Sequence, residues 1–75
     1  MIENILHAMM IGKVTLTYKS LMSGKTKSVT GTLEGDKFIR QDARNNKIIF
    51  WDIDNDRWED IECDTIQTWK GEKND

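Results

Sequence analysis

The spacing of apolar residues changes at Gly12, and this change constrains the fold more than any other feature of the sequence. Before the glycine, apolar residues recur every three or four positions, as on one face of an amphipathic helix: Ile2, Ile5, Leu6, Met9 and Met10. After it, apolar residues alternate with threonine and lysine through residues 13–19, which is typical of a half-buried strand. We therefore predict a short helix over residues 2–11 that is followed directly by a strand.

Turn-forming residues divide the rest of the chain into further short strands. They fall at Ser23-Gly24-Lys25, Gly35-Asp36, Asp42 to Asn46, Asp54 to Asp56 and Asp64-Thr65. The strands between these turns are predicted at residues 29–33, 38–39, 47–53, 57–62 and 66–70, of which 38–39 is the weakest. Short strands at this spacing are typical of a small closed or nearly closed barrel. We predict one mainly β domain of about five strands over residues 1–70 and a flexible tail over 71–75.

The surroundings of the three tryptophans predict which of them are buried in the core and which could contact a partner. Trp51 and Trp69 lie among apolar strand neighbours, so burial in the core is expected. Trp58 follows a charged turn and stands between Arg57 and Glu59, so partial exposure is expected. Tryptophan is enriched at binding hot spots, which makes Trp58 a candidate for contact with a partner.

The small size of the chain favours self-association, and its lone cysteine favours an intracellular location. A domain of 75 residues buries a thin core, and its single cysteine, Cys63, rules out an internal disulfide. A lone thiol without a secretion-type N-terminus indicates a reducing compartment, so we expect a cytoplasmic protein that contacts no membrane. The apolar stretch Met9, Met10 and Ile11 is predicted to mediate homo-oligomer formation.

Charge is distributed unevenly along the chain, although the net charge is only −2. Residues 13–47 carry eight Lys and Arg against three acidic residues, whereas residues 48–75 carry nine acidic residues against three basic ones. The acidic segment predicts a protein-binding surface on a hairpin. Its residues are Asp54, Asp56, Trp58, Glu59, Asp60 and Glu62.

The basic segment supplies the alternative, a face that binds RNA, DNA or a nucleotide. Its residues are Lys13, Lys19, Lys25, Lys27, Arg40, Arg44 and Lys47. Aromatic residues for base stacking are scarce among them, and the pI near 5.3 argues against nonspecific nucleic-acid binding. Lysines on the solvent face of strands also keep a small sheet soluble, which explains the same pattern without a ligand.

Side chains that could catalyse a reaction or hold a metal are few. The pattern Asp52-x-Asp54-x-Asp56 copies the first ligand positions of an EF-hand loop, but Arg57 stands where that loop needs Gly and Cys63 where it needs Glu. His7 and Cys63 show no third group that would orient them as base and nucleophile. We predict no enzyme activity, no catalytic residues, no metal and no cofactor.

The segment around the acidic turn also carries a family likeness. Ile49 to Trp58, with Ile61 and the corner Asp64-Thr65-Ile66, resembles the small phage proteins of the WYL-like, Sm-like SH3-barrel family, and the likeness spans most of residues 13–69. It implies a small Sm-like/SH3-like barrel of a helix and five strands, in a phage-type accessory protein of the host cytoplasm. The acidic residues at 59–62 depart from the Arg and aromatic residues frequent there in the family, which speaks against a nucleic-acid role for this strand.

Two functions therefore remain at this point. The first is a small non-enzymatic, phage-type regulatory protein that modulates a host protein through the acidic hairpin. The alternative is an Sm-like nucleic-acid or nucleotide binding module that uses the basic face. Fold alone does not decide between them, since related folds host many functions.

Overall fold

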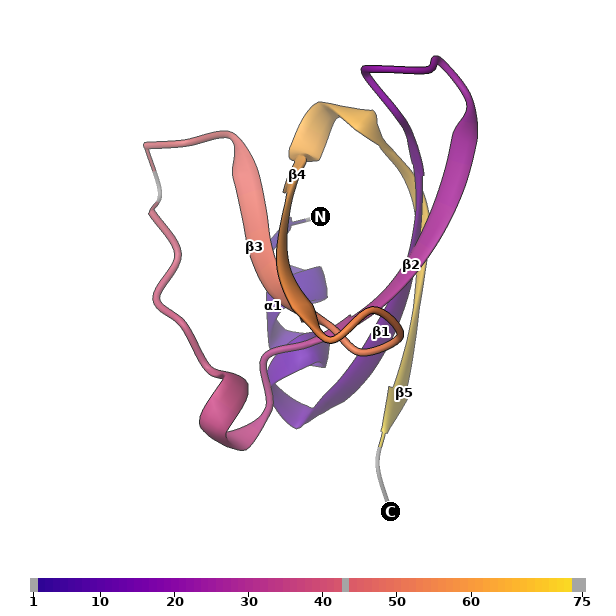
Figure 1. Cartoon of the computed structure of the whole chain (residues 1–75). Helices are drawn as coiled ribbons and strands as arrows, with labels where there is room; N and C mark the ends of the chain where they lie inside the picture. The colour runs from indigo at the N-terminus through magenta and orange to yellow at the C-terminus, as the bar shows by residue number, and fades with distance from the viewer. Residues whose placement is uncertain (1, 43, 74–75) are drawn as a thin grey trace.

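A computed structural model describes residues 2–42 and 44–73 as one N-terminal helix followed by a single antiparallel sheet (Figure 1). The helix is α1 (Ile2–Ile11), and the strands are β1 (Gly12–Lys19), β2 (Thr26–Thr32), β3 (Lys47–Asp52), β4 (Arg57–Glu62) and β5 (Ile66–Lys73). Two short 3₁₀ turns, η1 (Gly35–Lys37) and η2 (Cys63–Thr65), interrupt the connections. The predicted helix and the mainly β class are confirmed.

The end of α1 is fixed by a side-chain donor at the end of β2 and a backbone donor just after it. The Thr32 hydroxyl donates to the carbonyl of Gly12 at 2.7 Å and lies 3.3 Å from that of Met9, and the Leu33 N–H also donates to Met9 at 2.9 Å. The last carbonyls of a helix have no partner within the helix, so these bonds satisfy groups that burial would otherwise penalise. Thr32 thereby ties the helix to the sheet at the predicted helix end.

The sheet is open, and the predicted closure into a barrel does not occur. Its strand order is β4-β3-β2-β1-β5, and in the described part of the chain β4 and β5 are the two edges and do not pair with each other. β1 pairs along its length with β2 and β5. In the described residues, β2 and β3 pair only at Gly31 opposite Asp52 and Thr32 opposite Trp51, and one further backbone bond joins the Ile53 N–H to the Thr30 carbonyl at 3.0 Å. This narrow junction lets the β3–β4 hairpin turn away from the larger ladder instead of closing on β5.

The predicted strand at residues 38–39 is wrong, because these residues lie in an irregular connection between η1 and β3. Gln41 in this connection replaces a neighbouring strand: its side-chain amide donates to the Ile49 carbonyl at 2.8 Å and accepts from the Ile49 N–H at 2.9 Å. A single side chain thus satisfies the β3 backbone where β2 no longer reaches it.

The core lies between α1 and the concave face of the sheet. Among the described residues it contains nine buried apolar side chains, namely Ile5, Met9, Val14, Leu16, Leu33, Ile48, Phe50, Ile61 and Ile66. Trp69 packs against this cluster, but Trp51 does not join it, because it points to the opposite face of β3 from Phe50. The prediction that Trp51 belongs to the core is therefore wrong.

The end of the described chain is part of the sheet. β5 continues to Lys73, and Gly71, Glu72 and Lys73 stand opposite Val14, Lys13 and Gly12. Residues 71–73, predicted to be a flexible tail, are therefore strand residues, and residues 74–75 lie outside the described residues.

Candidate functional site: the β3–β4 hairpin and its free edge

The turn between β3 and β4 is held in place by one buried carboxylate. The Asp52 side chain is 1% exposed and accepts from the Asp54 and Asn55 N–H groups at 3.1 and 3.2 Å and from the Asn55 side chain at 2.8 Å. These bonds account for its burial. Asp54 and Asp56 follow it and are both exposed, so the turn presents two carboxylates to solvent on a fixed backbone.

The predicted acidic surface is divided between the two faces of β4. Ile61 is buried, and strand alternation therefore places Glu59 on the concave face and Trp58, Asp60 and Glu62 on the outer face. Two of these carboxylates are neutralised within the chain, since Glu59 bonds the Arg57 guanidinium and Asp60 lies 3.6 Å from the Lys47 ammonium. The acidic charge is therefore gathered along one edge strand rather than on one face.

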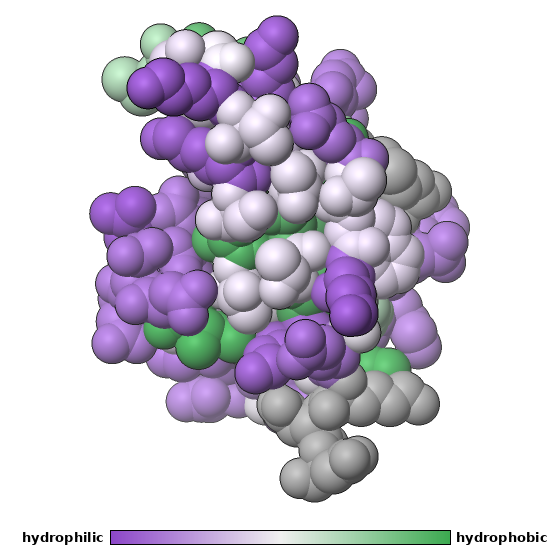
Figure 2. Space-filling model, turned by 90° about the vertical axis from the view of Figure 1, so that its right-hand side faces the viewer, coloured by the Kyte–Doolittle hydropathy of each residue, from purple (hydrophilic) through white to green (hydrophobic). Residues whose placement is uncertain are grey.

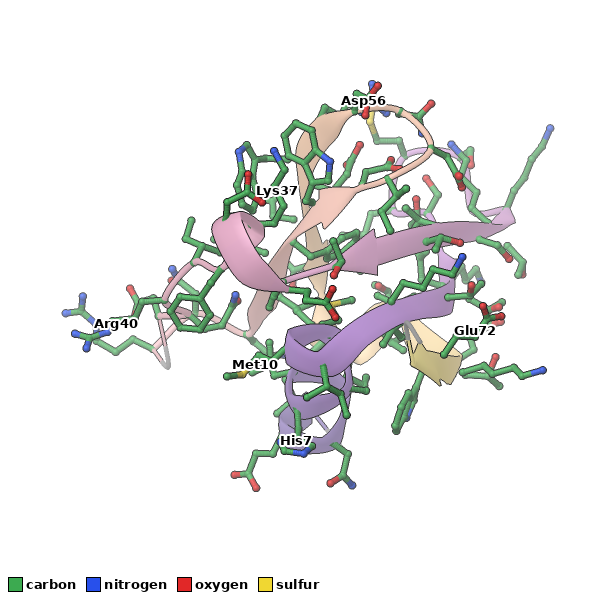
Figure 3. The ribbon with its side chains drawn as sticks, turned by 90° about the horizontal axis from the view of Figure 1, so that it is seen from below. His7, Met10, Lys37, Arg40, Asp56 and Glu72 are labelled. Carbon is green, nitrogen blue, oxygen red and sulfur yellow. The ribbon has the colours of Figure 1, made fainter. Side chains whose placement is uncertain are left out.

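Trp58 is 45% exposed, which confirms its predicted partial exposure. It packs edge-to-face against Trp51, with ring centroids 5.4 Å apart, and the Lys37 ammonium lies 3.7 Å from the centre of the Trp51 ring. Figure 3 shows Lys37 and Asp56 on the same part of the molecule, with Arg40 projecting elsewhere. Sequence reasoning missed Lys37, because only the fold brings η1 onto the outer face of β3.

A groove of about 230 Å³ follows the free edge of β4. Four consecutive β4 residues, Glu59 to Glu62, line one side of it, and Tyr18 to Leu21 line the other, with Lys47 and Thr65 completing the lining. Because alternate side chains of a strand point to opposite faces, four in succession can line a groove only at the strand's edge. The groove therefore gives access to the unpaired backbone of β4.

A second groove of about 450 Å³ continues onto the concave face of the sheet. It shares Tyr18, Ser20, Glu59 and Ile61 with the first groove. Its further lining includes the basic residues Lys27 and Arg57, so this end of the concave face carries charges of both signs. α1 packs on β1, β2 and β5, and this part of the sheet remains open.

The predicted basic face is not assembled. Lys19, Lys25 and Lys27 lie on the β1–β2 hairpin, whereas Arg40 and Arg44 lie on the connection before β3, on the other side of the molecule (Figure 1). Three members of the set form ion pairs within the chain: Lys13 with Glu72 at 3.8 Å, Arg44 with Asp42 at 3.2 Å and Lys47 with Asp60 at 3.6 Å. The hydrogen bonds from the Arg44 side chain and N–H also lower the pKa of Asp42. Of the predicted set, Lys19, Lys25 and Lys27 remain together on the β1–β2 hairpin, and the exposed Arg40 lies apart from them.

Two features of the β1–β2 hairpin escaped the sequence analysis. At its tip, Leu21 and Met22 are 76% and 99% exposed. On its outer face, hydroxyl side chains stand in register, with Thr15 and Thr30 oxygens 3.0 Å apart and Thr17 beside Ser28 at 3.4 Å. Figure 2 views the molecule from the side on which β2 and β5 lie in Figure 1, and the middle of that side is pale between purple hydrophilic side chains. The alternating threonines were the available signal for this face.

The predicted self-association segment is also divided by the fold. Met9 is fully buried in the core, and Met10 and Ile11 remain 47% and 43% exposed at the end of α1. A groove of about 260 Å³ lies beside Ile11, between α1 and β5, and is lined by Ala8, Ile11, Trp69, Gly71 and Glu72. Met9 must therefore be removed from the self-association surface, because it is unavailable to a second copy.

Groups that would indicate metal or thiol chemistry are not assembled in residues 2–42 and 44–73. No three His, Cys, Asp or Glu side chains in these ranges gather as metal ligands. Burial and the neighbouring Asp64 and Glu62 carboxylates raise the pKa of the Cys63 thiol, which lowers its reactivity near neutral pH. In the same ranges, α1 is too short to span a membrane, and no other helix has the length and apolar character to do so.

The fold and the grooves define a small open-sheet domain with a free acidic edge strand. Comparison of the chain with protein-family models, with curated proteins and with solved structures finds no match.

Proposed function

We propose that this chain is a small, non-enzymatic, phage-type regulatory protein of the host cytoplasm, which modulates a host protein through direct contact. The contact surface is the β3–β4 hairpin with the free edge of β4. The observation that carries the proposal is the coincidence of an unpaired strand edge, an adjoining groove and a concentration of carboxylates in one place.

The proposal includes membership of the Sm-like SH3-barrel family. Its support is the resemblance of residues 49–66 together with the element order, a helix followed by five antiparallel strands, which that resemblance implies. In this chain the sheet is open, so the proposed likeness concerns the strand core rather than a closed barrel.

The charge of the turn gives the first test. Asp54 and Asp56 are exposed, and their carboxylates accept no hydrogen bond from the part of the chain that the structure describes; the Asp52 carboxylate holds the turn. Asp54→Lys with Asp56→Lys should leave the domain folded and reduce the capture of a host protein from host lysate. The matched control is Glu3→Lys with Asp36→Lys, which changes the net charge equally at exposed sites on α1 and η1. Equal capture by both double variants would refute the role of the turn.

The alternative, binding of a nucleic acid or nucleotide, draws on the β1–β2 hairpin. Residues 12–33 contain four lysines and no acidic residue, and Lys27 reaches the groove on the concave face. Nuclease treatment of the lysate separates the two functions. Host proteins that remain bound after nuclease support the regulatory protein, and loss of every partner supports the nucleic-acid module, whose affinity should also fall steeply with salt.

A further inference from the structure

The backbone of β4 pairs with a neighbouring strand on one side only among the described residues. β4 ends the strand order, so β3 satisfies only one side of its backbone, and within residues 2–42 and 44–73 no other strand lies along the other side. An unpaired edge of this kind is a template for another strand. The 230 Å³ groove beside Glu59 to Glu62 leaves that side open between β4 and the end of β1.

The two faces of the groove set the chemistry of a strand that would fit there. Toward the core, Tyr18 and the 6% exposed Ile61 offer an apolar contact. Toward the outside, Asp60 and Glu62 offer carboxylates. Asp60 shares its charge with Lys47, 3.6 Å away in the same lining, whereas Glu62 forms no ion pair among the described residues and presents a full negative charge. A strand that alternates apolar with basic side chains would match both faces, because its side chains also alternate.

We propose that the free edge of β4 binds an extended segment of the partner protein as a sixth strand. The segment places apolar side chains against Tyr18 and Ile61 and Lys or Arg side chains against Asp60 and Glu62. This inference rests on the proposed function, because the segment belongs to the host protein that the chain is proposed to regulate.

Charge favours such a segment over a second copy of this chain. Two β4 edges side by side would bring their Asp60 and Glu62 carboxylates together, which like-charge repulsion opposes. The other edge strand, β5, carries Glu72 beside Lys70, so it offers less positive charge than a segment with Lys or Arg at every second position.

A synthetic peptide tests the proposal directly. The probe is a fluorescein-labelled peptide of about eight residues that alternates Lys and Val, titrated with the full chain and followed by anisotropy. We expect saturable binding. The same peptide with N-methyl groups on alternate backbone amides keeps its charge but cannot pair as a strand, and should not bind. A peptide that alternates Glu and Val should not bind either.

Paired variants locate the site. Asp60→Lys with Glu62→Lys should weaken binding by about tenfold, because two attractive contacts become repulsive. Glu3→Lys with Asp36→Lys makes the same change in net charge away from the groove and should bind like the unmodified chain. Circular dichroism of each variant confirms that a loss of binding is not a loss of fold.

Hydrogen exchange reports the strand itself. Amides within residues 57–62 that do not bond β3 should exchange more slowly when the peptide is bound. Equal binding of the N-methylated peptide, or protection confined to other elements, would overturn the proposal. Protection of these amides that grows with protein concentration alone would assign the edge to a second copy and overturn it as well.

The inference and the proposed function can fail separately. If the turn variants lose a host protein from lysate but the peptide does not bind, the regulatory function stands and the sixth strand is refuted. If the peptide binds at β4 but no host protein is captured, the strand site stands and the proposed function is refuted.

Discussion

Gly31 lies where β2 passes closest to the core, and its missing side chain makes room for Phe50. A methyl group on Gly31 would lie 2.6 Å from Cε2 of the Phe50 ring and closer still to Cδ2. Phe50 is fully buried, so its ring has little freedom to move aside. Gly31→Ala should therefore lower the free energy of unfolding by about 2 kcal/mol, measured by urea denaturation.

A variant with a smaller side chain in place of the Phe50 ring is the control for Gly31→Ala. Phe50→Leu alone should destabilise the domain, but Gly31→Ala should cost less in that background, because the clash is removed. Equal costs in both backgrounds would contradict the packing explanation and point to the backbone of β2 instead.

The Cys63 thiol should react slowly near neutral pH. Burial, followed by the charges of Asp64 and Glu62, raises the pKa of this thiol, so less thiolate is present at a given pH than for an unperturbed cysteine. Iodoacetamide should alkylate Cys63 more slowly than it alkylates glutathione at pH 8. The rate of Cys63 alkylation should increase as the pH is raised above 8. Asp64→Asn should lower the pKa and speed the reaction at pH 8, and an unchanged rate would show that the carboxylate has no influence.

Among the elements, β3 depends on an unusual neighbour. Only two of its residues pair with β2, and the Gln41 side chain bonds both backbone groups of Ile49. Gln41→Ala should lower the free energy of unfolding by about 1–2 kcal/mol, because a backbone donor and acceptor lose their partners. The Ile49 amide should also exchange faster. Gln67→Ala, at an exposed site on β5, is the control, and equal effects of the two variants would contradict this role.

The elements that sequence predicts best are those with a long, regular apolar pattern. The helix over residues 2–11 follows from the spacing of its apolar residues, and the strands around 47–52 and 57–62 follow from the turn residues that bound them. The exposure of Trp58 follows from its charged neighbours. The predicted strand at 38–39, which does not form, depended on two residues. Two residues are too few to show the alternation of apolar and polar side chains that marks a strand. Gln41 carries no local signal either, because its bonds depend on how the connection returns to β3.

For the whole molecule, the relations between distant strands decide what the sequence leaves open. Barrel closure requires β4 and β5 to pair, which no local pattern encodes. The acidic residues are adjacent in the sequence, but β4 turns them to both faces. The basic residues also share one half of the sequence, but the fold places them on two sides of the molecule. Charge signs could be predicted from the sequence, whereas their grouping could not.

We expect copies of this chain to associate through the exposed end of α1. The core is thin, and the end of α1 leaves Met10 and Ile11 47% and 43% exposed beside the groove that includes Trp69. We expect a dimer or larger species by sedimentation at about tens of micromolar. Met10→Ser with Ile11→Ser should shift the equilibrium toward the monomer, because the two substitutions remove apolar surface from the contact between copies.

The β1–β2 hairpin tip supplies a demanding control for this assembly. Leu21 and Met22 are more exposed than Met10 and Ile11, so Leu21→Ser with Met22→Ser removes at least as much apolar surface, but at the far end of β1 from α1. If assembly depends on the end of α1, this variant should sediment like the unmodified chain. Loss of assembly in the tip variant alone would move the contact to the hairpin, and a monomeric unmodified chain would refute self-association altogether. Since Met9 is held in the core, Met9→Ser should unfold the domain rather than merely separate its copies, which distinguishes a core residue from a contact residue within one helix.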